Sequence, residues 1–179
     1  QAKALSERLK NMEIDVIYSS PIERAYKTAE IIKGNKDVEI IKHDGLKEFN
    51  YGDWEGLTID EIEKNPMYTK ELNNLFNSPR EYKPFGGETY DDIIKRIDIT
   101  MNEILGKSKD KKILIVTHGM TLKVLLHYFN ENMTLDDIVK LPVMGQTSLT
   151  KIDVVDGKYN LVFQNDTSHY DDNHVQVGW

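Results

Sequence analysis

The strongest candidate for chemistry in the sequence is a histidine between an expected strand and an expected helix. His118 and Gly119 follow the apolar run that begins at Ile113. In open α/β sheets, ligands gather outside the carboxyl ends of the strands, which is where His118 would point. Gly119 lets the backbone approach a ligand closely, and the free amides that begin the next helix favour an anion. The pattern equally suits a histidine that only hydrogen-bonds within a tight turn.

A second candidate is Arg24, in the first turn of the helix expected after Ser19-Ser20-Pro21. An arginine offers a planar pair of N–H donors that matches the geometry of a phosphate. Its positive charge is unfavourable near the amino end of a helix unless an anion lies close by. The alternative is a surface arginine paired with Glu23 or Asp15, which would contribute little.

The third candidate lies in the loop from Gly45 to Gly56, where glycines, aromatic residues and acids gather as is typical of a loop that carries a site. Glu48 is the candidate proton donor of this loop. Tyr51 and Trp54 would form a wall of the pocket, where Trp54 would contact the substrate. The alternative is a loop anchored by its aromatic residues, with its acids in solvent.

Helices and strands must alternate along the chain to position these three candidates. Ser20 is the expected N-cap of the helix that carries Arg24, with Glu23 as its capping-box partner. The apolar run 113–117 is expected to form a central strand buried on both faces, and Asp156-Gly157 predicts a hairpin turn. Helices are expected over residues 1–11, 20–34, 58–64, 66–76, 91–105, 119–129 and near 134–137, and strands over 15–19, 38–42, 113–117, 148–155 and 159–164. This order predicts an α/β fold, a three-layer sandwich with a mostly parallel central sheet, helices on both faces and a C-terminal β-hairpin.

Length, charge and composition exclude several classes of protein for this chain. A chain of 179 residues is expected to form one domain over residues 1–179. The net charge of −7 argues against a sequence-independent nucleic-acid partner, and no apolar run is long enough to cross a membrane. The absence of cysteine excludes disulfides, thiolate metal sites and cysteine nucleophiles. We expect a cytoplasmic monomer or homodimer with neither a metal nor a cofactor.

Five segments, in order, resemble the histidine phosphatase superfamily, which has the phosphoglycerate-mutase-like fold. They are Ser19-Ser20-Pro21 with Arg24-Ala25 and Thr28-Ala29, Leu46-Lys47-Glu48 with Gly52-Asp53-Trp54-Glu55-Gly56, Gly86-Gly87-Glu88-Thr89, Val116-Thr117-His118-Gly119, and Asn165-Asp166-Thr167-Ser168-His169. The Gly-Asp-Trp-Glu-Gly run and the short span between Gly56 and Gly86 resemble the phosphatase branch more than the mutases.

The resemblance implies a phosphate pocket of two arginines and two histidines beside an acid. Arg24 matches the second arginine, His118 the second histidine and Glu48 the proton donor. Substrate contacts would come from Arg24, from the backbone at Gly119 and Met120 and, more loosely, from Thr147. The implied reaction transfers the phosphoryl group of a small phosphorylated substrate to a histidine nitrogen, and water then hydrolyses the phosphohistidine without a metal.

The chain departs from the family pattern at its beginning. The first strand of the family ends in Arg-His-Gly, whose histidine is the nucleophile, and no Arg-His pair occurs in the sequence. Gln1 matches the helix that follows this motif, so the chain is expected to be truncated at its N-terminus and inactive by itself. The alternatives are phosphoryl transfer of the phosphoglycerate mutase type, or a non-catalytic phosphate-binding pseudoenzyme if the natural chain begins near Gln1.

Overall fold

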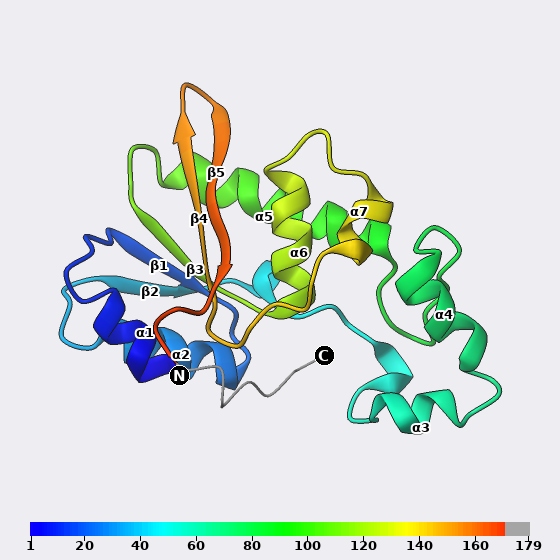
Figure 1. Cartoon of the computed structure of the whole chain (residues 1–179). Coiled ribbons are helices and arrows are strands. Elements are labelled where there is room, and N and C mark those ends of the chain that lie inside the picture. The colour runs from blue at the N-terminus through cyan, green and yellow to red at the C-terminus, as the bar shows by residue number, and fades with distance from the viewer. Residues whose placement is uncertain (171–179) are drawn as a thin grey trace.

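A parallel three-stranded sheet organises the computed structural model, which describes residues 1–170 (Figure 1). The strands are β1 (Val16–Ser19), β2 (Glu39–Lys42) and β3 (Ile113–Val116), in the order β2-β1-β3. Both pairings are parallel, so the carboxyl ends of all three strands meet at one edge of the sheet.

Helices cover both faces of this sheet and enclose two apolar cores. Ile17 of β1 packs against α1 (Ala2–Arg8) and α2 (Glu23–Lys33) on one face. Val16 and Tyr18 of β1 point to the other face, as alternation along a strand requires. There they join the core formed by α5 (Tyr90–Lys107) and α6 (Gly119–Tyr128). The predicted three-layer α/β architecture is therefore confirmed.

Strand β3 is the edge strand of this sheet in the described chain, contrary to the expectation for residues 113–117. It pairs with β1 alone, and β1 is the central strand with all of its residues buried. Ile113, Leu114 and Ile115 are only half-buried. A continuous apolar run indicates that both faces of a strand are covered, but it contains no information about the strand's edges.

The C-terminal hairpin consists of β4 (Leu149–Val155) and β5 (Lys158–Asp166), which pair antiparallel as a separate sheet. Asp156 and Gly157 have φ angles of 51° and 74°, the left-handed pair that a tight type I′ turn requires. The predicted hairpin and its turn are confirmed.

The remaining elements form the far end of the molecule and the loops near the sheet. Helices α3 (Ile59–Glu63) and α4 (Thr69–Asn77) lie away from the sheet, and α4 contacts α7 (Leu135–Lys140) (Figure 1). Two short 3₁₀ turns, η1 (Asp44–Leu46) and η2 (Gly52–Trp54), bracket the loop that carries Glu48. Within residues 1–170, no helix is both long and apolar enough to span a membrane.

Candidate active site

The three candidate residues line one groove of about 1980 Å³, which includes the carboxyl edge of the sheet and continues along β3. Arg24 follows β1 and His118 follows β3, so the two neighbouring parallel strands place them at the same edge. Glu48 comes from the loop beyond β2 and η1. The sheet topology thus brings together residues that lie up to 94 positions apart in the sequence.

His118 is held by a contact with Ser20 that the sequence did not reveal. Its Nε2 lies 2.8 Å from Oγ of Ser20, and both residues are buried. The Ser20 hydroxyl accepts a hydrogen bond from the amide of Ile22 at 3.2 Å, so its own proton is available for Nε2. This arrangement favours the tautomer of His118 that carries its proton on Nδ1.

The predicted capping role of Ser20 is wrong. Helix α2 begins at Glu23 with Ile22 as its N-cap, and no side chain caps it. The physical reason is that the Ser20 hydroxyl lies in the turn before the helix, where it contacts the His118 ring.

The ring of His118 is neutral at pH 7. Burial first, and then the positive charges of Arg24 and Arg96, lower the pKa of His118 from 6.5 to about 4. A neutral imidazole with its proton on Nδ1 keeps one N–H donor besides the nitrogen that contacts Ser20.

We predict that this histidine makes the fold sensitive to acid. Between pH 6.5 and 4 the unfolded chain binds a proton at His118 and the folded chain does not, so stability falls as the pH falls through this window. The expected loss is about 2 kcal/mol, which is less than the full pKa shift implies because solvent screens part of the interaction. Urea unfolding at a series of pH values measures it. His118→Gln should flatten this part of the profile and His43→Gln should not, whereas equal profiles for His118→Gln and the unchanged chain would contradict the prediction.

Arg24 presents its guanidinium to the groove without a protein partner in the described chain. Its side chain is exposed, and residues 1–170 offer it neither an ion pair nor a hydrogen bond. The two suggested surface partners are engaged elsewhere. Glu23 pairs with Lys27 at 2.5 Å, and Asp15 accepts a hydrogen bond from the amide of Lys112 at 2.6 Å. The donors of Arg24 are therefore available to an anionic ligand.

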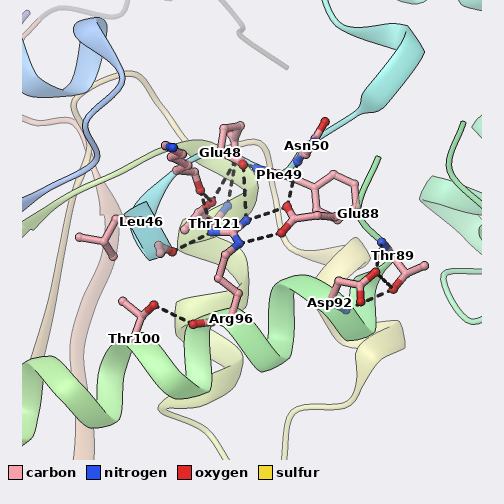
Figure 2. Close-up of polar contacts among 12 residues, drawn as sticks. Leu46, Glu48, Phe49, Asn50, Glu88, Thr89, Asp92, Arg96, Thr100 and Thr121 are labelled. Atoms are coloured by element: carbon pink, nitrogen blue, oxygen red, sulfur yellow. Dashed lines mark hydrogen bonds and ion pairs between the residues drawn. The ribbon is translucent and has the colours of Figure 1, made fainter. Parts of the chain in front are cut away.

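Glu48 uses one carboxylate oxygen for the protein and leaves the other open (Figure 2). Oε1 accepts hydrogen bonds from the amide of Phe49 at 2.9 Å, the amide of Thr121 at 3.1 Å and the Thr121 hydroxyl at 3.2 Å. Oε2 has no hydrogen-bond partner among residues 1–170. This second oxygen can exchange a proton with a ligand in the groove.

The first amides of α6 have two different surroundings: one donates a hydrogen bond to Glu48, and two have no partner in the described chain. The first amides of a helix have no partner within the helix. Thr121 donates its amide to Glu48, whereas the amides of Gly119 and Met120 have no partner in the described chain. They suit an anion at the positive end of the helix. The side chain of Met120 is buried in the core, so only its backbone is available to a ligand.

The last two residues predicted to contact the substrate, Trp54 and Thr147, have different surroundings in the structure. Trp54 borders the groove but is only 2% exposed, and its indole packs against Tyr68, Tyr82 and Phe85. Its main contribution is therefore to the aromatic core. Thr147 lines the groove with a φ of 54°, and its Oγ1 is buried without a partner in the described chain.

Arg96 is the principal residue that sequence reasoning missed. It lies on α5, and it donates hydrogen bonds to Glu88 and to the backbone carbonyls around Glu48. The signal available in the sequence is weak. Arg96 is one of few arginines in a lysine-rich chain, and it lies eight residues after Glu88.

These observations describe an α/β protein in which cationic and N–H donors line the same groove as a carboxylate with one open oxygen. Cationic and N–H donors next to an acid are what the transfer or hydrolysis of a phosphoryl group requires. Within residues 1–170, no cluster of three or more metal-ligating His, Asp or Glu side chains occurs.

The chain belongs to the histidine phosphatase superfamily (branch 1), whose family model matches residues 1–167. Phosphoserine phosphatase 1 of Hydrogenobacter thermophilus is 29% identical over 125 residues, which cover 70% of this chain and 58% of that protein. Phosphoglycerate mutase-like protein 4 of Arabidopsis thaliana is 30% identical over 177 residues, which cover 96% of this chain and 74% of that protein. The solved structure of YhfR from Bacillus stearothermophilus matches with a TM-score of 0.87 and 35% identity, covering 94% of this chain and 82% of that one. The predicted family and fold are thereby confirmed, and relatives named as phosphatases and as mutases both occur.

Proposed function

We propose that this chain is part of a phosphatase domain that hydrolyses small phosphomonoesters through a phosphohistidine intermediate. The observation that supports it best is that Arg24, His118 and Glu48 all line one groove, with Arg24 close enough to His118 to lower its pKa. Phosphorylated metabolites are charged and do not cross a bilayer readily, so the proposal includes a cytoplasmic location.

In the proposed reaction, a histidine nitrogen attacks phosphorus while the bond from phosphorus to the ester oxygen breaks. Glu48 protonates the departing alkoxide, which prevents the build-up of negative charge on it. Water then attacks the phosphohistidine, its proton passes to the Glu48 carboxylate, and inorganic phosphate and the free histidine are released. Throughout, Arg24, Nδ1–H of His118 and the amides of Gly119 and Met120 would neutralise the phosphoryl oxygens.

The attacking histidine in this proposal is the one of the family's Arg-His-Gly motif, which the 179 residues do not contain. The shape of the groove supports a place for it. Ile113–Val116 of β3 and residues 149–154 of β4 all line the groove. Successive residues of a strand point to opposite faces, so a groove lined by consecutive residues runs along the strand edges. We propose that a further strand pairs there with β3, ends in Arg-His-Gly and completes a single domain with residues 1–179.

The binding half of the proposal can be tested on the chain as it is. Arg24→Ala should weaken the binding of inorganic phosphate or vanadate roughly 10-fold to 100-fold, because two charge-assisted hydrogen bonds are lost. Isothermal titration calorimetry measures the dissociation constants.

The matched control is Arg80→Ala, which removes an exposed arginine outside the groove. Equal affinities for Arg24→Ala and Arg80→Ala would contradict the role of Arg24. Binding without any turnover once the Arg-His-Gly strand is present would favour the pseudoenzyme. Phosphoserine, the substrate in one relative's name, is a natural first ester to assay, and 3-phosphoglycerate separates hydrolysis from isomerisation.

A further inference from the structure

The guanidinium of Arg96 binds a carboxylate on one side and the backbone of the Glu48 loop on the other (Figure 2). Its Nε and Nη2 each lie 2.7 Å from a different oxygen of Glu88, which makes the pair bidentate. Its Nη1 donates to the carbonyls of Gly45 at 2.7 Å and Lys47 at 3.1 Å, and Nη2 donates to the carbonyl of Glu48 at 3.4 Å.

Every backbone carbonyl from Gly45 to Glu48 accepts a hydrogen bond from a side chain. Arg96 serves three of these carbonyls, as described above. The hydroxyl of Thr117 donates to the carbonyl of Leu46 at 2.8 Å, and the hydroxyl of Thr121 donates to that of Lys47 at 2.8 Å. Side chains, and not the backbone hydrogen bonds of a sheet, hold this irregular segment in place. Arg96 donates three of the five hydrogen bonds.

Glu88 extends the same clamp beyond Glu48. Its carboxylate accepts a hydrogen bond from the amide of Asn50 at 3.0 Å, and the carbonyl of Asn50 accepts one from the amide of Glu88 at 2.8 Å. The backbone is therefore held on both sides of Glu48. A shift of the loop would break the two bonds that join Oε1 of Glu48 to Thr121 on α6 and would redirect the open oxygen of Glu48.

We propose that Arg96 is a positioning residue that aims the open carboxylate oxygen of Glu48 at the leaving group, with Glu88 fixing the orientation of the guanidinium. The inference rests on the proton-donor role of Glu48 in the proposed function. Lysine does not replace arginine in this position, because a single ammonium group cannot span both a carboxylate and three carbonyls.

The geometric part of the inference can be measured without any activity, on the 179-residue chain. In Arg96→Lys, the amide proton of Thr121 should move upfield in NMR spectra, because its hydrogen bond to Glu48 is lost. Arg80→Lys, the same change at an exposed arginine, should leave the Thr121 amide proton unchanged. A Thr121 amide proton that keeps its position in both Arg96→Lys and Glu88→Gln would overturn the proposal.

The functional part is measured on the chain extended by the Arg-His-Gly strand. Arg96→Lys should lower kcat/KM for alkyl phosphates about 10-fold to 100-fold and for nitrophenyl phosphate less than about 3-fold, with phosphate affinity unchanged. A merely structural ion pair would lower both esters alike, and that result would overturn the inference. If the extended chain does not hydrolyse either ester, the proposed function fails, while the Thr121 amide still reports on the clamp.

Discussion

The 179-residue chain should hydrolyse nitrophenyl phosphate roughly four orders of magnitude more slowly than the same chain extended by an N-terminal strand that ends in Arg-His-Gly. In the proposed function, the groove supplies the groups that bind the phosphoryl oxygens, and the histidine of the added motif supplies the atom that attacks phosphorus. In the tautomer favoured by Ser20, the lone pair of His118 is on Nε2, and Nε2 is engaged with the serine hydroxyl at 2.8 Å. Steady-state release of nitrophenolate by the two proteins measures the ratio.

The control for this experiment is the extended chain with the histidine of its added motif changed to alanine. This variant should be as slow as the 179-residue chain, and acid-labile phosphate should be trapped on the protein only when that histidine is present. Hydrolysis by the 179-residue chain at a rate typical of enzymes, abolished by His118→Ala, would show that His118 is the nucleophile and would overturn the proposed division of roles.

Much of the fold was predictable because it depends on local chemistry. Asp156-Gly157 predicts its turn through the φ angles that these residues tolerate, and the structure has those angles. The three candidate residues were also predictable as a group, because parallel strands bring their carboxyl ends to one edge. Their individual roles in the reaction stay predictions.

The features that sequence reasoning missed depend on contacts between distant segments. Arg96 binds backbone carbonyls, which every residue possesses, so no pattern of residue types marks its partners. Ser20 has the residue type and the position of an N-cap. Its contact with His118 joins residues 98 positions apart and is visible only in the structure. The edge position of β3 was also missed, because the pairing of a strand depends on the other strands of the sheet and not on its own sequence.

Glu48→Gln in the extended chain should lower kcat/KM for alkyl phosphates about 100-fold to 1000-fold, and for nitrophenyl phosphate by less than about 10-fold. An alkoxide is a poor leaving group without a proton, whereas nitrophenolate is a stable anion. The glutamine oxygen can still accept from the amides of Phe49 and Thr121, so the loop should keep its shape. The ratio kcat/KM is the right quantity, because it reports the steps up to the first departure of the alcohol.

The matched control is Glu55→Gln, a second acid of the same loop that also lines the groove and accepts the amide of Tyr51 at 3.0 Å. Its effect should be small and equal for both esters. Equal losses in kcat/KM for the two esters in Glu48→Gln would reject the acid role.

The second half-reaction gives an independent test, because Glu48 is also the base that activates water in the proposed reaction. With nitrophenyl phosphate, Glu48→Gln should therefore release about one nitrophenolate per chain in a fast burst and then turn over slowly, since phosphorylation no longer limits the rate and hydrolysis of the phosphohistidine does.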